Sequence, residues 1–140
     1  MAQKDYEIVE HTADLGIRVR GKDLQDLFIN AARAVFDIIA SSCQAKTPEC
    51  RKINITQKAD DVEQLLVNWL NELLSLSAVK GLIFTDFKIK KLDAHNLEAV
   101  VSGADSSGYA MNKEIKAATY HELKVRKSSA GWQAEVILDV

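Results

Sequence analysis

Residues 15–24, with the sequence LGIRVRGKDL, contain a strand, a break and the start of a helix, and they decide how the chain folds. From Leu15 to Val19, apolar residues alternate with small or charged ones, and this period of two predicts a strand with one packed face. Gly21 interrupts the strand. Asp23 then occupies the position where a helix N-cap accepts backbone hydrogen bonds.

An amphipathic helix is predicted from Asp23 to about Ala40, because apolar residues recur three and four positions apart. A loop containing Ser41 and Thr47-Pro48 is expected after it. Before the opening stretch, residues 6–10 are expected to be extended and to lead into a turn. The apolar stripe of the helix consists of Leu24, Leu27, Phe28, Ala31, Val35, Ile38 and Ile39.

A second strand and a second helix follow. Ile53 and Ile55 alternate with polar residues, which predicts a strand. Asp60, with Glu63 three residues later, predicts a capped helix, and Gly81 is a natural stop for it. The apolar stripe of this helix consists of Val62, Leu65, Leu66, Trp69, Leu70, Leu73 and Leu74.

The pattern beyond Gly81 is that of strands. Residues 82–101 predict one hairpin with a turn at 93–96, and residues 123–138 predict another with a turn at 128–131. The expected fold class is therefore α+β, with two amphipathic helices packed on one side of mixed or antiparallel sheets.

The composition is typical of one water-soluble domain over residues 1–140, with 47% hydrophobic and 27% charged residues and a formal net charge of -2. No apolar run approaches the roughly 20 residues that a membrane span requires, and no secretory signal opens the chain. Cys43 and Cys50 are expected to be free thiols, which suits a reducing compartment. We therefore expect a cytoplasmic protein without a membrane segment.

The sequence lacks the motifs of common enzymes. It contains no Gly-x-x-x-x-Gly-Lys loop, no Gly-x-Gly-x-x-Gly and no Gly-x-Ser-x-Gly, and its three histidines do not have zinc-site spacing. A structural role of His11 in the turn is favoured over a role as a base. Cys43 and Cys50 without a third ligand are better explained as ordinary thiols than as a metal site. No catalytic residue is predicted.

The run Lys88, Lys90 and Lys91 lies on a predicted strand. Because Lys88 and Lys90 share its outward side, a solvated face that protects a sheet edge is favoured over phosphate binding. Trp69 and Trp132 lie on apolar faces and are expected in the core rather than as stacking platforms for bases.

Two aspartates near opposite ends of the chain lie off the predicted core face. Asp14 is an even number of positions from Arg18, and Asp139 from Glu135, so each aspartate is expected on the same face of its strand as that charged residue. Asp139 also adjoins the α-carboxylate of Val140, so oxygen ligands gather at the end of a strand, where with waters they would suit Ca²⁺ or Mg²⁺. Spacing does not show that Asp14 and Asp139 meet, and two unrelated surface aspartates remain the simpler interpretation from spacing alone.

Several segments spread over nearly the whole chain form a more specific pattern. They are residues 11–19 (HTADLGIRV), 21–24 (GKDL), 30–36 (NAARAVF), 67–74 (VNWLNELL), 114–121 (EIKAATYH) and 136–140 (VILDV). In content and order they closely resemble the archease family. Ala118 departs from the larger apolar residue expected there, at a position without a functional role.

The resemblance implies two interlocked strand-helix-strand-strand modules, one inserted in the other. It implies a non-enzymatic protein cofactor of the RtcB-type tRNA-splicing ligase that promotes ligase guanylylation and multiple turnover in tRNA splicing and RNA repair. It also implies a metal site at Asp14, Asp139 and a backbone oxygen of Val140. Ca²⁺ is the leading candidate, with Mg²⁺ and Mn²⁺ as alternatives. Glu114 and Lys116 are candidate contacts with the ligase, tRNA is met only indirectly, and a monomer or weak oligomer is expected.

Two other functions stay open. A chaperone-like modulator of RNA-modifying enzymes such as methyltransferases, also suggested for the family, requires an exposed apolar or oligomerising surface. Direct RNA binding through Lys88, Lys90, Lys91 and Arg126 is disfavoured by the acidic balance of the chain. Only activation through the metal site would depend on both Asp14 and Asp139.

Overall fold

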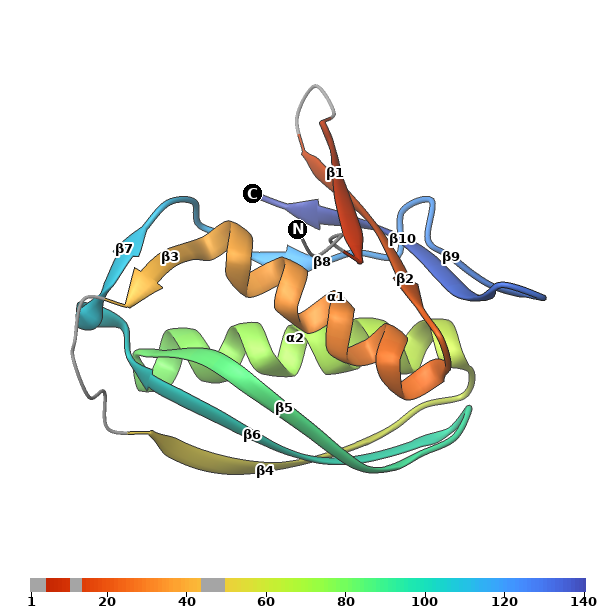
Figure 1. Ribbon diagram of the computed structural model, residues 1–140, viewed down its shortest axis with the longest axis horizontal. Helices are drawn as coiled ribbons and strands as arrows, with labels where there is room; N and C mark the ends of the chain where they lie inside the picture. Colours follow the sequence, from red (N-terminus) through yellow and green to blue (C-terminus); the bar gives the residue numbers. More distant parts are fainter. Residues whose placement is uncertain (1–4, 11–13, 44–49) are drawn as a thin grey trace.

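Within residues 5–10, 14–43 and 50–140, which the computed structural model describes, the chain forms two α-helices and three antiparallel sheets (Figure 1). The largest sheet has the strand order β1-β2-β10-β8, and β9 also pairs with β10. We call it the terminal sheet because its strands come from both ends of the chain. They are β1 (Tyr6–Glu10), β2 (Leu15–Gly21), β8 (Ala117–Ala118), β9 (Lys124–Ser128) and β10 (Gly131–Asp139).

The middle of the chain forms a second sheet with the order β4-β6-β5, called here the inserted sheet. The short strands β3 and β7 pair with each other and form a third, two-stranded sheet. The inserted sheet consists of β4 (Arg51–Lys58), β5 (Leu82–Leu92) and β6 (Asn96–Asp105). The third sheet consists of β3 (Ala40–Cys43) and β7 (Tyr109–Met111), and a 3₁₀ turn at Ser106–Gly108 precedes β7.

The helices α1 (Leu24–Ile39) and α2 (Val62–Lys80) form a layer between the two sheets (Figure 1). α1 contacts β2 and β5, and α2 contacts β5 and β8, so each helix meets both sheets. The buried indole of Trp69 joins the helices, since its Nε1 donates to the carbonyl oxygen of Phe28 at 2.9 Å. In the described part of the chain, no helix is both long and apolar enough to cross a membrane.

The predicted α+β class is confirmed, and the chain order explains the two sheets. The elements β4, α2, β5 and β6 are continuous in sequence, and they interrupt the chain between β3 and β7. We call these four elements the inserted module; it contributes α2, and the rest of the chain contributes α1. The two helices pack together with a sheet on either side. This matches the inserted arrangement that the family resemblance implies.

The helix ends follow the capping rules, with one shift. Asp23 caps α1 as predicted, and Gly81 ends α2 in the left-handed region, at φ 64°. The N-cap of α2 is Asp61 rather than the predicted Asp60. Its carboxylate accepts from the N–H of Gln64 at 2.8 Å, while the Gln64 side chain accepts from the N–H of Asp60 at 2.7 Å. Gln64, rather than the predicted Glu63, is therefore the capping-box residue whose side chain bonds back to the start of the helix.

The segment after α1 differs from the prediction. The chain continues from Ile39 directly into β3, so Ser41 lies in a strand instead of a loop. β3 pairs with β7, which lies about seventy positions further along the sequence. A local sequence pattern cannot predict pairing between strands so far apart. Thr47-Pro48 and the side chain of Cys43 lie outside the described residues, so the expectation of free thiols stays a prediction.

Both predicted hairpins are confirmed, as β5–β6 and β9–β10. In the first turn, the carboxylate of Asp93 accepts from the N–H groups of His95 and Asn96 at 2.8 and 2.9 Å, and these bonds lower the pKa of Asp93. Lys88 and Lys90 are exposed, as expected for a solvated face.

Tyr6 on β1 ties this edge strand to α1. Its hydroxyl donates to Oδ2 of Asp37 at 3.0 Å. Partial burial, this hydrogen bond and the charge of Asp37 raise the pKa of Tyr6 to about 12, from 10.0. The folded state therefore favours the neutral phenol.

We expect Tyr6→Phe to lower the free energy of unfolding by about 1 kcal/mol at neutral pH, since the hydrogen bond is lost. Because the folded pKa lies above the unfolded one, the contribution of Tyr6 is complete below pH 10 and is lost as the pH rises toward 12. Urea unfolding of both proteins across this window should show the difference between them shrinking. Tyr120→Phe, at an exposed position, is the control. An unchanged difference at high pH would contradict the assignment.

Candidate functional site at the end of the terminal sheet

Asp14 and Asp139 are brought together by the pairing of β2 with β10. The antiparallel register matches Gly16 with Ile137 and Leu15 with Leu138. The next position along β10 is Asp139, and the next position before β2 is Asp14. The two aspartates therefore stand opposite each other at the end of the sheet. We call this end, with Val140, the acidic tip.

The two carboxylates of the acidic tip have different surroundings. Asp14 is half-buried, and its Oδ1 is shielded from solvent. Asp139 is exposed, while its backbone carbonyl accepts from the N–H of Lys116 at 2.8 Å. Val140 is half-buried and packs against the core. The backbone of the tip is thus anchored, and the Asp139 carboxylate faces outward.

Strand β8 supports the acidic tip from the side. Ala117 pairs with Asp139, and Ala118 pairs with Leu138. Asn71 of α2 holds Ala118 from the other side: its Oδ1 accepts from the Ala118 N–H at 2.7 Å, and its Nδ2 donates to the Ala118 oxygen at 3.1 Å. The side chain thus replaces a neighbouring strand, and it fixes β8 between α2 and β10.

We expect Asn71→Ala to lower the free energy of unfolding by about 3 kcal/mol, because both backbone groups of buried Ala118 lose their partner. Amide hydrogen exchange at Lys116 should also accelerate more than exchange in β6, since the tip loosens before the whole molecule unfolds. Asn68→Ala, on the same helix, is the matched control, because the Asn68 side chain donates a long bond of 3.4 Å to the Lys58 carbonyl oxygen and does not contact β8 through a hydrogen bond in the described part of the chain. Equal acceleration at Lys116 and in β6 would contradict a local role.

The chemistry of the acidic tip fits a hard cation. Carboxylate and carbonyl oxygens are the ligands that Ca²⁺ and Mg²⁺ take, with waters completing the shell. The tip offers Asp14, Asp139 and a backbone oxygen of Val140. Among the described residues, no three His, Cys, Asp or Glu side chains lie close enough to hold a metal ion. A metal site here would therefore need main-chain oxygens as ligands beside the two aspartates. His11, for which the sequence favours a structural role, lies outside the described residues.

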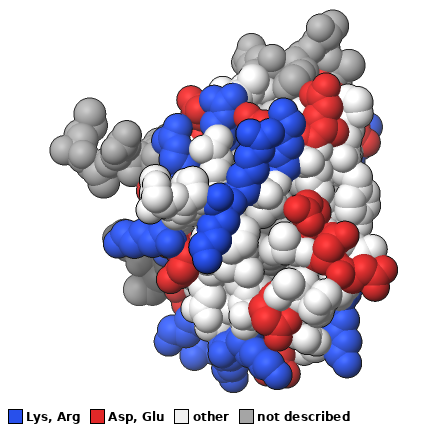
Figure 2. Space-filling view, turned by 90° about the vertical axis from the view of Figure 1, so that its right-hand side faces the viewer, with Lys and Arg blue, Asp and Glu red and all other residues white. Residues whose placement is uncertain are grey.

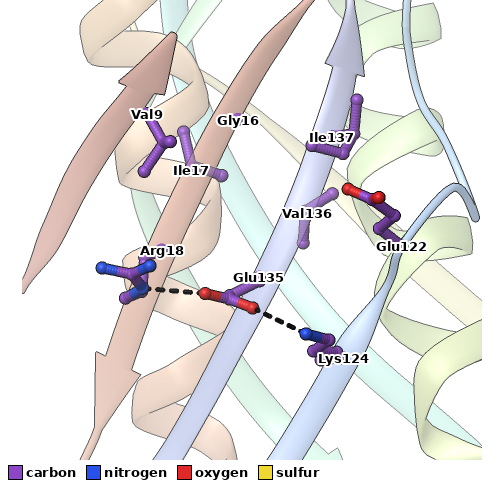
Figure 3. Close-up of a pocket in the computed structure, with 9 residues that line it drawn as sticks. All are labelled: Val9, Gly16, Ile17, Arg18, Glu122, Lys124, Glu135, Val136 and Ile137. Atoms are coloured by element: carbon purple, nitrogen blue, oxygen red, sulfur yellow. Dashed lines mark hydrogen bonds and ion pairs between the residues drawn. The ribbon is translucent and has the colours of Figure 1, made fainter. Parts of the chain in front are cut away.

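Next to the tip, the outer face of the terminal sheet carries a chain of ion pairs (Figure 3). Arg18 Nε donates to Glu135 Oε1 at 2.9 Å, and Arg18 also bonds Glu7. Lys124 Nζ lies 3.8 Å from the other oxygen of Glu135. The bond from Arg18 lowers the pKa of Glu135, and the bonds to Glu135 and Glu7 raise that of Arg18. Solvent screens these half-exposed pairs, so their effect on stability is small.

A hollow of about 170 Å³ separates these ion pairs from the acidic tip. Its floor is at Gly16, and Val9 and Ile137, the partners of Gly16 on the neighbouring strands, flank it. Glu122 reaches over it from the turn before β9 (Figure 3). The sequence predicted neither this hollow nor the support from Asn71; the one available signal for the hollow was a glycine on the polar face of a strand.

The candidate partner contacts, Glu114 and Lys116, are both exposed in the irregular segment before β8. Ile115 between them is buried and anchors the segment. The bond from Lys116 N–H to the Asp139 carbonyl places Lys116 beside the acidic tip. Glu114 instead lines a groove with Met111. The structure therefore connects only Lys116 directly with the tip.

On the right-hand side of the molecule as drawn in Figure 1, Lys and Arg gather in an upper and a lower group, and Asp and Glu lie between and beside them (Figure 2). A nucleic-acid interface usually shows a continuous stripe of Lys and Arg. On the outer face of the terminal sheet, Glu7 and Glu135 interrupt the row formed with Arg18 and Lys124. This charge pattern suits a protein surface better than a phosphate backbone.

The fold and the tip define a small α+β domain with an inserted module and two aspartates opposite each other at a sheet end. The model of the Archease protein family (MTH1598/TM1083) matches residues 6–140. The chain belongs to the archease family.

Individual archeases support this assignment. The chain is 35% identical to the Protein archease of Methanosarcina acetivorans, over 98% of this chain and 97% of that one. It is 37% identical to the Protein archease of Pyrococcus abyssi, over 98% and 99% of the two chains.

Two solved structures have the same fold. Protein 1598 of Methanobacterium thermoautotrophicum has a TM-score of 0.75 at 30% identity and covers 99% of this chain and 100% of its own. TM1083 of Thermotoga maritima, described as an archease and possible chaperone, has a TM-score of 0.68 at 21% identity and 94% coverage of both chains. At that identity, TM1083 supports the fold alone.

Proposed function

We propose that this chain is a protein cofactor, not an enzyme, which activates an RtcB-type tRNA-splicing ligase in tRNA splicing and RNA repair. The observation that carries the proposal is the register of β2 and β10, which sets Asp14 opposite Asp139 in a chain of the archease family. We place this activity in the cytoplasm, with the chain acting as a monomer or weak oligomer and meeting tRNA only through the ligase.

The acidic tip is the proposed working part. Asp14, Asp139 and a backbone oxygen of Val140 would hold a divalent cation, with Ca²⁺ favoured over Mg²⁺ and Mn²⁺. A bound cation supplies positive charge that offsets the repulsion between the two carboxylates. The β2–β10 pairing holds the tip in one shape, and Lys116 beside it and Glu114 further along offer polar contacts to the ligase.

Activation follows if the tip binds one state of the ligase better than another. A partner can shift a conformational equilibrium only by its difference in affinity for the two states. The proposed state is the one competent to accept the nucleotide on the ligase's active-site histidine. Release of the cofactor after each cycle would let a substoichiometric amount support many turnovers.

We expect wild-type protein at substoichiometric amounts to stimulate multiple-turnover ligation by the cognate ligase, and Asp14→Asn and Asp139→Asn each to abolish the stimulation. Ca²⁺ at about a hundred times its dissociation constant should stabilise the wild-type fold by about 2.7 kcal/mol and leave both variants unchanged. Ligation assays and thermal unfolding with and without Ca²⁺ measure the two effects.

Asp86→Asn is the matched control, because Asp86 is an exposed strand aspartate in the inserted sheet. It should keep both stimulation and the Ca²⁺ effect. Stimulation by all three variants would refute the proposed tip while leaving the partner correct. No stimulation by the wild type would refute the partner.

A chaperone-like modulator of RNA-modifying enzymes is the second candidate, favoured by a groove of about 430 Å³ between α2 and the segment after β7. Its lining includes Leu74, Ile83 and Ile115, and Met111 at its border is 58% exposed. Leu74, Ile83 and Ile115 are themselves buried, so Met111 supplies the exposed apolar surface that suits contact with another protein. In this case Met111→Asp, and neither tip variant, would abolish stimulation of the partner enzyme.

A further inference from the structure

The hollow beside the acidic tip has a volume suited to one side chain, and we call it the slot. Gly16 contributes no side chain, so backbone forms the floor between Val9 on β1 and Ile137 on β10. The two flanking side chains are aliphatic, and the volume of about 170 Å³ is that of a single residue rather than of a nucleotide. The slot therefore suits an unbranched aliphatic stem.

The charges at one end of the slot already satisfy one another. Arg18 uses Nε for Glu135 and a terminal nitrogen for Glu7, and Lys124 pairs with the second oxygen of Glu135. An incoming anion would have to break these pairs to reach a cation. The slot is consequently a poor site for phosphate or carboxylate.

Glu122 is the charge that remains. Within the described part of the chain it makes no hydrogen bond or ion pair, and its carboxylate points over the slot toward Ile137 (Figure 3). Its backbone has φ 51°, in the left-handed region that glycine and asparagine adopt more easily. A glutamate kept in a strained turn, with its charge held over a hollow, is a typical mark of a functional position.

We propose that this slot receives one lysine or arginine side chain from the surface of a protein partner. The methylene stem packs against Val9 and Ile137 above Gly16, and the cationic head pairs with Glu122. A neutral apolar side chain would fill the slot but leave Glu122 without a partner, and an acidic one would be repelled by it. The inference goes beyond ligase activation, because it requires only a protein partner with an exposed basic residue.

The test is a titration of the ¹⁵N-labelled full chain, without metal or ligase, with the peptides Ac-Gly-Arg-Gly-NH₂ and Ac-Gly-Nle-Gly-NH₂. The arginine peptide should bind with a millimolar dissociation constant and shift the amide signals of Gly16, Glu122 and Ile137. The norleucine peptide, which keeps the stem and lacks the charge, should bind about threefold more weakly, the ratio expected of one exposed ion pair.

Glu122→Gln should reduce binding of the arginine peptide to the norleucine level, whereas Glu98→Gln, at an exposed position in the inserted sheet, should not change it. Glu122→Gly should lose the same binding and raise the melting temperature, because glycine relieves the positive φ. Equal binding of the two peptides, tighter binding of Ac-Gly-Glu-Gly-NH₂, or no shift at the slot would each overturn the proposal. These outcomes are independent of the metal and the ligase, so they are distinguishable from a failure of the proposed function.

Discussion

The antiparallel pairing of β2 with β10 is the constraint on which the rest of the structure depends. It joins a strand that begins at Leu15 to one that ends at Asp139, so the two ends of the chain meet in one sheet. A shift of this register by one residue would turn every side chain of one strand to the other face. Asp14 and Asp139 would then face apart, and Arg18 would lose Glu135. The tip, the slot and the ion pairs all require the same alignment.

The inserted module stabilises the terminal sheet through contacts of α2 with α1 and β8. α2 belongs to the inserted module by sequence, yet its Trp69 bonds the backbone of α1 and its Asn71 bonds the backbone of β8. These bonds link side chains to buried or half-buried main-chain groups, which are costly to leave without partners. Through these contacts α2 stabilises β8, the strand that pairs with Asp139.

The outer face of the terminal sheet is left uncovered by the helices, which pack on its other face. The described part of that face is filled mostly by paired charges, with Gly16 leaving a gap among them. Partly exposed ion pairs of this kind contribute little to stability but fix which charges remain open to a partner. The face is thus better suited to selecting a protein surface than to holding the fold together.

The sequence by itself determined the helices, the hairpins and the α+β class, because those depend on local periodicity and capping. Asp23 and Gly81 mark helix ends in any fold that uses these segments. Sequence also supplied the parity of Asp14 and Asp139, and the resemblance supplied their suggested role. Only the tertiary structure placed them opposite each other, paired β3 with β7 and set Asn71 on Ala118. Such contacts join residues far apart in the chain, and their energy comes from packing and register that no local pattern records.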